Sequence, residues 1–424
     1  MESFAHGVGP RTQSASLRIS IILSFSCLFA WPGGCSQQAG RYSPPAGTPT
    51  VRVLLLENQQ RVEISATDMP TIHLGPQDPG QQLQFPKGSS VPISLTPSGW
   101  QIGTAQLGPG ELRLDQAVDG SVRIGKHAYH GRYRLVPAGI GRFNVMNDVD
   151  MESYLKGVLR SELFPNWHDE AYKAQAIVAR TYALFESRTD GVGRSFDVYC
   201  DQRSQVYGGI DAETPRSREA TEATAGIVVA FGPAGHEVIF KSYFSSCCGG
   251  IAQSATDAFG DDDIPPLTDQ KRGNCCSESP KFNWGPISIP KVELTRRLRA
   301  WGVWRKQPFK DIGMIARFEI QQTSRFGRPM RFMVTDARGY RYSIRAEDLR
   351  EAINTDAGPT GTKVFSSFFK PIDHGPDILF TDGHGYGHGV GMCQWCAEHQ
   401  AGQGWNDESI VLSAFPGAKL VQAY

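Results

Sequence analysis

The spacing of hydrophobic and polar positions changes near Asn147, and this change divides the sequence into two parts. Before it, short alternating or wholly apolar runs are separated by Gly, Pro and Asp, which is typical of strands joined by turns. The strands predicted from these runs include residues 51–56, 61–65, 121–124 and 133–136. Residues 51–146 are therefore expected to form a β-rich subregion, followed by a core of residues 147–424.

Two amphipathic helices are predicted directly after this change. Asp148 or Asp150 can cap the first helix, and Glu152 lies near its positive end. Apolar residues then recur at helical spacing until Pro165, which stops the helix. The second helix is predicted to begin at Asn166, whose side chain can cap it, and two acidic residues occupy its first turn.

Strands and helices both follow in the rest of the chain. The predicted strands are residues 226–230, 238–243, 314–321, 330–335 and 340–344, and the predicted helices are 292–301, 346–353 and a segment after Gly391. Because the two kinds of element are segregated rather than regularly alternating, the pattern predicts an α+β fold with antiparallel strands and not a doubly wound α/β sheet.

Composition and charge narrow the class of protein. The 424 residues are 40% hydrophobic and 20% charged, so the chain can bury a core and is not predominantly disordered. Lys and Arg together number 43, as do Asp and Glu, so the formal net charge is zero. The chain thus lacks the excess of positive charge that is typical of a dedicated nucleic-acid-binding protein.

The first 50 residues have the pattern of an export signal and a linker. Arg11 and Arg18 precede an apolar run, residues 19–31, that is too short to span a bilayer comfortably. Residues 1–35 are thus interpreted as a secretory signal and residues 36–50 as a linker. Small residues before Cys35 resemble a lipoprotein cleavage site. If the protein is attached to a membrane, we expect the attachment to be a lipid anchor at Cys35. The alternative is a plain signal peptide. The expected location is the cell envelope or periplasm.

Seven of the nine cysteines follow Cys35, and they are Cys200, Cys247, Cys248, Cys275, Cys276, Cys393 and Cys396. Outside the cytosol disulfides are allowed, and an odd number leaves one thiol unpaired. The two adjacent pairs and the Cys-Gln-Trp-Cys run could instead hold a structural zinc ion, although their spacing fits no standard zinc pattern. We favour disulfides, or a mixture of disulfides and metal ligation, over zinc alone, and we expect that catalysis requires no cofactor.

Glu162 is the first candidate for chemistry. It lies at the predicted end of the first helix, next to Leu163 and Phe164 and across a turn from Trp167. An apolar setting raises the pKa of a carboxyl, and a carboxyl that stays protonated can donate a proton to a leaving oxygen. The alternative is a solvated glutamate at a helix end, paired with Arg160 or Lys156.

The second candidate is the run GHGYGHGVGMCQWC, residues 383–396. Its alternating glycines let the backbone adopt positive φ and approach a ligand, and they display His384 and His388. The run lacks the ending of a phosphate-binding loop, and a His-Glu-x-x-His zinc motif is also missing. A binding role is favoured over a tight turn with exposed histidines. Tyr243, in the segment SYFSSCCGG, is a weaker candidate because tyrosines at strand ends are common in cores.

Taken together, these motifs resemble the SpoIID/LytB family, which comprises stage II sporulation protein D and the amidase enhancers. The resemblance is carried by YLKGVLRSELFPNWHDEAYKAQAIVARTYA at 154–183, QVYGG at 205–209, GHGVGMCQ at 387–394 and FPG at 415–417. It covers nearly everything from Val51 to the C-terminus. Four departures accompany it: Phe164 is an insertion, Ser245 replaces a histidine, and Cys248 and Cys393 replace serines. The substitutions by cysteine suggest that these segments lie together.

The resemblance implies a protein that acts on peptidoglycan glycan strands. Members like SpoIID are lytic transglycosylases that use one glutamate, here Glu162, as acid and then base, and they form 1,6-anhydro sugars. His388, Gln394 and Tyr243 are expected to orient the sugar, Trp167 could stack on it, and further contacts are expected from Arg180, Gly387 and Gly389. The alternative is a non-catalytic glycan-binding module that activates a cell-wall amidase, or an envelope scaffold.

Overall fold

The computed structural model describes residues 47–66, 71–74, 82–84, 88–115, 122–358 and 361–424. The predicted signal and Cys35, with most of the linker, lie outside these residues. Within the described part, no helix has the length and apolar composition that a membrane span requires. The described chain divides into two compact units, one formed by Val53–Val149 and the other by residues 47–52 and Asp150–Tyr424.

The first unit is built from two sheets. One has the strand order β1 (Thr50–Gln59), β12 (Arg142–Asp150), β11 (Arg132–Gly139), β8 (Leu112–Asp115), β3 (Thr71–Leu74) and β4 (Gln82–Gln84). The other has the order β10 (His127–Tyr129), β9 (Val122–Ile124), β2 (Arg61–Ala66), β5 (Ser90–Thr96), β6 (Gly99–Ile102) and β7 (Ala105–Leu107). Alternate residues of these strands are buried, and the rings of Trp100 and Phe143 meet edge to face in the interior at 5.0 Å.

The second unit begins with the two predicted helices. Helix α1 (Met151–Glu162) is capped by Asp150, whose side chain accepts a hydrogen bond from the Ser153 N–H at 3.0 Å. The predicted start of the second helix at Asn166 was wrong, because α2 (Asp169–Arg188) begins three residues later. The Trp167 N–H donates to the Phe164 carbonyl and closes a turn before the helix. Residue 166 therefore lies in that turn.

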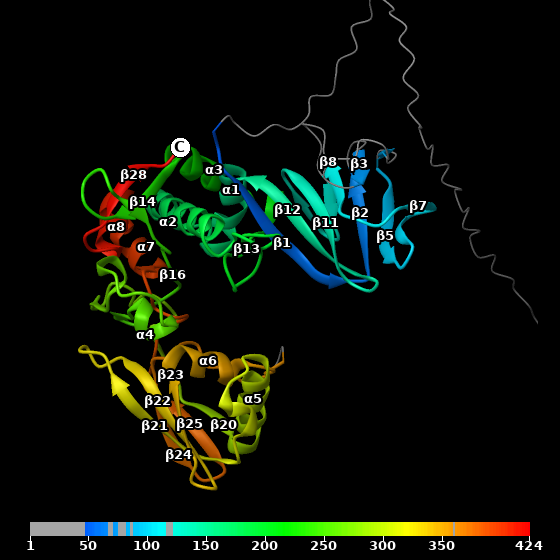
Figure 1. The fold of residues 1–424 in the computed structure, drawn as a ribbon. Helices are drawn as coiled ribbons and strands as arrows, with labels where there is room; N and C mark the ends of the chain where they lie inside the picture. The colour runs from blue at the N-terminus through cyan, green and yellow to red at the C-terminus, as the bar shows by residue number, and fades with distance from the viewer. Residues whose placement is uncertain (1–46, 67–70, 75–81, 85–87, 116–121, 359–360) are drawn as a thin grey trace, which may run out of the picture. The chain divides into compact units, whose positions relative to one another are not determined.

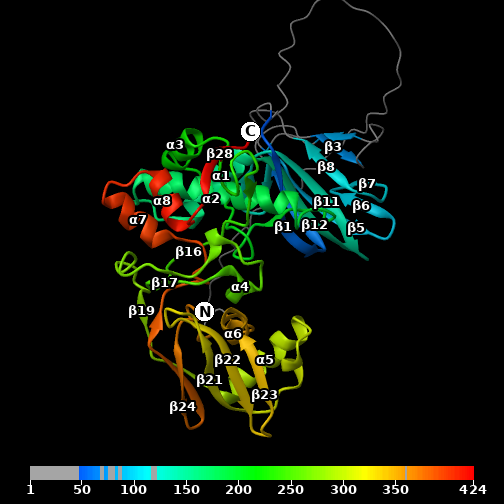
Figure 2. The same cartoon turned by 60° about the vertical axis from the view of Figure 1, so that its left-hand side comes forward.

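Helix α2 is the centre of this unit. It contacts α1, α3 (Pro215–Ala223), α7 (Gln394–Gly402), α8 (Asp407–Ala414) and β14 (Ile227–Phe231), as Figures 1 and 2 show. Strand β14 lies between β15 (Val238–Ile239) and β28 (Lys419–Gln422), so the end of the chain returns to this helical region. The predicted strand over residues 238–243 is shorter than expected, since regular pairing ends at Ile239.

A further part of the second unit has its own hydrophobic cluster. It contains two three-stranded sheets, β20 (Ile287–Pro290), β25 (Asp377–Thr381) and β24 (Lys370–His374), and β21 (Ile315–Thr323), β22 (Pro329–Asp336) and β23 (Arg341–Arg345). Helices α5 (Lys291–Trp304) and α6 (Ala346–Asn354) pack with these strands (Figure 1).

The remaining α-helices and strands are short: β13 (Val198–Tyr199), β16 (Phe244–Ser245), β17 (Ile251–Ala252), α4 (Ala255–Phe259), β18 (Gln270–Lys271), β19 (Asn283–Trp284), β26 (Gly383–His384) and β27 (Met392–Cys393). The predicted α+β class is confirmed.

A buried ion pair joins the first two helices of the unit. Arg180 of α2 is 0% exposed, and its Nη2 and Nε donate to the Glu152 carboxylate of α1 at 2.7 and 2.9 Å. The guanidinium also donates to the carbonyls of Ile227 and Thr221, and the Tyr424 hydroxyl donates to the same carboxylate at 2.6 Å. Arg180 therefore ties α1, α3, β14 and the C-terminus together.

Removing this arginine is expected to destabilise the protein strongly. Arg180→Ala leaves the Glu152 carboxylate without its cation, and breaking a buried pair in this way costs roughly 3–5 kcal/mol. The matched control is Arg317→Ala, since the Arg317–Glu319 pair lies at the surface with side chains 58% and 41% exposed; exposed pairs contribute about 1 kcal/mol or less. Urea denaturation of both variants measures the difference, and equal losses of stability would contradict the assignment.

Candidate active site

The Glu162 side chain lies at the C-terminal end of α1 and is half-buried. Its Oε1 accepts a hydrogen bond from the Val206 N–H at 2.7 Å. The side chain of Gln394, at the first position of α7, also hydrogen-bonds to it. Two segments far apart in the sequence therefore hold this carboxyl. The predicted alternative partners are engaged elsewhere, because Lys156 pairs with Glu222 and Arg160 donates to the Leu163 carbonyl.

The segment 205–209, QVYGG, presents the Val206 N–H to the carboxyl. The Tyr154 hydroxyl of α1 donates to the Gln205 side chain at 2.9 Å, and that side chain in turn donates to the Ala179 carbonyl of α2 at 3.3 Å. The Gly208 N–H donates to the carbonyl of Gly157. A Cβ on Gly157 would lie 2.7 Å from the Tyr207 ring, so only glycine allows this close approach to α1. The sequence alone predicts no role for the QVYGG motif.

Burial raises the pKa of Glu162, while the hydrogen bonds from Val206 and Gln394 act in the opposite direction. Both hydrogen bonds favour the carboxylate, yet desolvation is the larger effect. The group is thus a proton donor that also has two donors ready to stabilise its anion. A group of this kind can act as an acid and then as a base.

Gln394 reaches the carboxyl because of a short parallel pairing. Strand β27 pairs with β16, with Phe244 opposite Met392 and Ser245 opposite Cys393. The chain then turns into α7, where the Gln394 side chain is 5% exposed and donates weakly to Gln175 of α2 at 3.5 Å. The structure thus brings together Glu162 and Gln394, which the sequence places in separate motifs.

His388 lies in a different environment from Glu162. Its ring packs edge to face on Tyr243 and Phe259 at 5.8 and 5.3 Å. Its Nδ1 accepts a hydrogen bond from the Val390 N–H, and the ring also hydrogen-bonds to the Phe244 backbone. Burial lowers the pKa of His388 to about 4, so the ring is neutral near pH 7. The polar contacts described for His388 are to the backbone, and none of them is to Glu162.

Tyr243 is engaged inside the protein. Its hydroxyl donates to the Asp261 carboxylate at 2.6 Å, and its ring stacks on Phe259 at 4.7 Å. Burial raises the pKa of Tyr243, and the hydrogen bond to Asp261 adds to this effect. Arg180 is likewise enclosed by the contacts given above. Tyr243 and Arg180 are thus held by contacts within the protein. The sugar contacts that the family resemblance implies for them stay predictions.

The glycine run is used for close packing between segments. Gly385, Gly387, Gly389 and Gly391 all have positive φ. A Cβ on Gly389 would collide with the guanidinium of Arg328, and a Cβ on Gly391 would collide with the Tyr243 carbonyl. Protein groups therefore occupy the space that the missing side chains leave at these two positions. At Gly387 the approach is looser, since its Cβ would lie 3.1 Å from that of Ser245.

Three aromatic rings cluster next to residues that form the site, since Phe164 follows Glu162 by two positions and Trp395 follows Gln394. Phe164, two residues after Glu162, is 52% exposed. Its ring lies 5.4 Å from Trp167 and 5.8 Å from Trp395, and the two tryptophans are 5.1 Å apart. Trp395 follows Gln394 directly in the chain. Sequence analysis named Trp167 but missed Trp395, because its approach to α1 depends on where the start of α7 lies in the fold.

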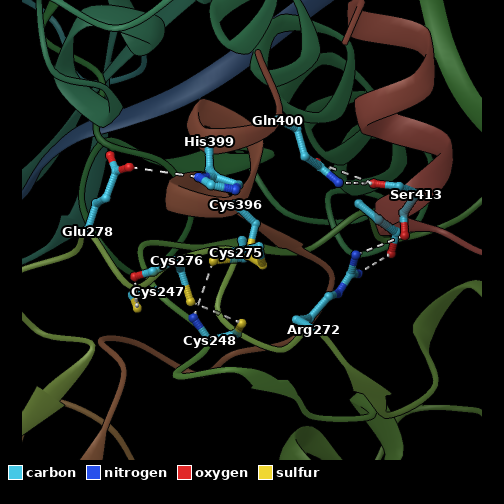
Figure 3. The surroundings of a disulfide bond; sticks show 12 residues. Cys247, Cys248, Arg272, Cys275, Cys276, Glu278, Cys396, His399, Gln400 and Ser413 are labelled. Carbon is cyan, nitrogen blue, oxygen red and sulfur yellow. Dashed lines mark hydrogen bonds and ion pairs between the residues drawn. A yellow bond between two sulfur atoms is a disulfide. The ribbon is translucent and has the colours of Figure 1, made fainter. Parts of the chain in front are cut away.

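The cysteine-bearing segments also lie together, as Figure 3 shows. Cys275 and Cys396 form a disulfide, whereas Cys247, Cys248, Cys276 and Cys393 are buried free thiols in the same cluster. Cys200 is half-buried and lies outside this cluster. Disulfides were expected, and one is present among the described residues.

Comparison with known proteins agrees with the sequence resemblance. The model of a family described as "SpoIID: Stage II sporulation protein" matches residues 140–231, a range that contains Glu162 and Val206 but not Gln394. Stage II sporulation protein D of Bacillus subtilis (strain 168) is 25% identical over 292 residues, 66% of this chain and 76% of the relative. An uncharacterized protein of Brachyspira hyodysenteriae is 28% identical over 294 residues, 69% of this chain and 72% of the relative.

The amidase enhancer of Bacillus subtilis (strain 168) is also similar, with 23% identity over 306 residues. The match covers 63% of this chain and 40% of that longer relative. Together, the family model and these named relatives confirm the resemblance to the SpoIID/LytB family.

The packing role of the glycine run can be tested with one pair of alanine variants. In Gly391→Ala the new Cβ meets the Tyr243 carbonyl, whereas Gly404 has a similar positive φ and open space around it. Left-handed strain costs about 1–2 kcal/mol in both variants, and overpacking adds about 1–3 kcal/mol in Gly391→Ala alone. Thermal and urea unfolding should therefore rank Gly391→Ala below Gly404→Ala. Equal stabilities would show that the contact relaxes at no cost.

Proposed function

We propose that this protein is a lytic transglycosylase that cleaves the bond between N-acetylmuramic acid and N-acetylglucosamine in glycan strands. The observation that supports this most strongly is the state of Glu162. Its carboxyl has a raised pKa, is partly accessible, and accepts hydrogen bonds from a backbone N–H and a side-chain amide. Similarity to relatives named stage II sporulation protein D and amidase enhancer also supports the proposal.

The chemistry needs one group that changes its role. Glu162 first donates its proton to the glycosidic oxygen, and the bond to the anomeric carbon breaks. The resulting carboxylate is stabilised by Val206 and Gln394, and it takes the proton from the C6 hydroxyl of the same sugar as that oxygen attacks the anomeric carbon. The product is a 1,6-anhydro sugar, and no water is consumed. The attack is intramolecular, so part of the entropic cost of bringing reactants together is already met.

A hydrolase of the usual type would need a second carboxylate at a defined distance from the first. The mechanism proposed here needs only the one carboxyl, and the hydrogen-bond partners described for Glu162 are amides. One carboxyl with amide donors fits a mechanism in which the same group is both acid and base. Gln394 therefore takes a positioning role in this proposal.

The aromatic cluster offers a surface for the sugar. Sugar faces carry C–H groups that pack on aromatic rings, and Phe164, two residues after Glu162, presents a half-exposed ring. The rings of Trp167 and Trp395 contact that ring. We place the sugar next to Glu162 on Phe164, with Gln394 at the same end of α7.

The proposed substrate places the protein in the cell envelope. This location agrees with the export signal predicted for residues 1–35, which lies outside the described residues. The proposed partners are peptidoglycan glycan strands and a cell-wall amidase, because an amidase that removes stem peptides would produce the denuded strands.

A second function is favoured by one specific observation. Ser245 stands where the family often has histidine; it is 7% exposed, and its hydroxyl accepts a hydrogen bond from the Gly389 N–H at 3.1 Å. If catalysis requires an imidazole at that position, the protein instead binds glycan and activates an amidase without cleaving the strand. The two functions differ in whether glycan is converted to product.

The acid role of Glu162 is tested by Glu162→Gln. Incubation of the wild-type protein with peptide-free glycan strands should release products lighter by one water than hydrolytic ones, as measured by mass spectrometry. Glu162→Gln keeps the size and shape of the side chain but has no acidic proton to donate. The amount of product should therefore fall by at least about 100-fold. The matched control is Glu222→Gln, a surface glutamate with a 66% exposed side chain, which should keep full activity.

The outcomes separate the two functions. Activity retained in Glu162→Gln would remove this residue from the acid role. Glycan co-sedimentation by the wild-type protein without any anhydro product would instead support the binding function. Circular dichroism of each variant checks that the fold persists.

The pH dependence tests the role of Gln394. Its hydrogen bond lowers the pKa of Glu162, so Gln394→Ala should raise that pKa further. Because the protonated carboxyl is the active form, kcat/KM falls as pH rises through the pKa, and the alkaline limb of the profile should move to higher pH in the variant. A lower rate with an unmoved alkaline limb would show that Gln394 acts only through structure.

A further inference from the structure

Four buried sulfur atoms converge at one point in the second unit. They belong to Cys248, Cys276, Cys393 and Cys396, and all four lie within 4.8 Å of one another. The Sγ atoms of Cys248 and Cys276 are 3.6 Å apart, and the Cys248 N–H donates to the Cys393 Sγ at 3.3 Å. Figure 3 shows Cys248, Cys276 and Cys396 facing the same space.

From this convergence we propose that the reduced protein binds one zinc ion through these four thiolates. Zinc bonds to thiolate sulfur at about 2.3 Å in tetrahedral geometry, so the ligand sulfurs of such a site lie about 3.8 Å apart. The Cys248–Cys276 separation of 3.6 Å is close to this value, and no two of the four sulfurs are more than 4.8 Å apart. Cys393 and Cys396 are separated by two residues, which is a common spacing for a pair of zinc ligands. The other two ligands come from different loops, so no zinc pattern was recognisable in the sequence.

The charge around the cluster suits this site. A zinc ion with four thiolates carries a net charge of −2, which is costly to bury unless cations lie close by. Arg272 interacts electrostatically with Cys248, Cys276 and Cys393, and the fully buried Arg328 does so with Cys248. The Nη1 of Arg328 also donates to the Cys248 carbonyl at 2.9 Å. The Nε atoms of both arginines are buried without a hydrogen-bond partner, and a nearby anionic cluster would offset that cost.

The disulfide and the zinc site compete for one ligand. Cys396 is bonded to Cys275, so the site is complete only after that bond takes up two electrons and two protons and becomes two thiols. Zinc binding then displaces the protons of the four ligand thiols. A thiol or phosphine reductant supplies the electrons. The protein thus has an oxidised form with the disulfide and a reduced form with the metal.

The site would also fix the start of α7. Gln394 lies between the ligands Cys393 and Cys396, and Cys248 and Cys276 belong to segments that precede β17 and β19. A zinc ion would therefore cross-link three separate segments around the residue that contacts Glu162. This role does not require that the proposed catalysis is correct, because zinc binding is measured by itself.

The test measures metal on the full chain. The protein is reduced with a phosphine, incubated with excess Zn²⁺ and desalted. The zinc that stays bound to each chain is then measured by elemental mass spectrometry. One zinc per chain is expected in the wild type, and Cys393→Ser should lose it. Cys200→Ser and Cys247→Ser are the controls, since Cys200 lies outside the cluster and Cys247 is a buried thiol that does not belong to the ligand set; both should keep one zinc.

Cys275→Ser gives an independent test, because this variant is expected to gain zinc binding rather than lose it. This substitution frees Cys396 from the disulfide, so the variant should bind one zinc even without reductant, when the wild type does not. Co²⁺ in place of Zn²⁺ should then give the thiolate-to-cobalt absorption and the intense visible bands of a tetrahedral sulfur site. Absence of metal from both the reduced wild type and Cys275→Ser would overturn the proposal, as would loss of zinc on removing Cys200.

Discussion

The hydrogen bonds that hold the Glu162 carboxyl are the contacts on which the account depends. A carboxyl at the end of an isolated helix would be solvated and ionised near pH 7. Here the Val206 N–H binds it from a loop that is itself anchored on α1 and α2, and Gln394 binds it from the start of α7. Desolvation raises the pKa of Glu162 and so favours the protonated acid, and the two donors stabilise the anion once the proton has left. The same environment thus serves both halves of the proposed reaction.

The rest of the second unit keeps these three segments in place. Arg180 joins the two helices that carry Glu162 and Gln175, and its buried pairing explains why an arginine is found at the centre of the unit. The glycine run allows β27 to pass close to Tyr243 and Arg328, so that β27 pairs with β16 and α7 begins beside α1. Tyr243, Arg180 and Gly389, for which the family resemblance implies sugar contacts, thus also build the frame that positions one acid.

Much of the local structure could be predicted from the sequence, whereas the assembly of the site could not. The spacing of apolar residues from Met151 to Leu159 and the cap at Asp150 located α1 correctly. The start of α2 was misplaced, because a turn closed by Trp167 consumes the residues after Pro165. The neighbours of Glu162 in the chain suggested an apolar setting, but its polar partners are 44 and 232 residues away in sequence and depend on loop geometry that no local pattern encodes. The same reason applies to the thiols, whose convergence follows from the fold and not from their spacing.

The central claim is that Glu162 holds its proton in the folded protein at a pH where an ordinary glutamate has lost it. Carbon-13 NMR of the glutamate carboxyls, recorded over a pH titration of the wild type and of Glu162→Gln, assigns the one resonance that the variant lacks. The account predicts that this resonance titrates clearly above the ordinary value of 4.5. A resonance that titrates at or below 4.5 would contradict it, since the carboxyl would then be ionised before substrate arrives.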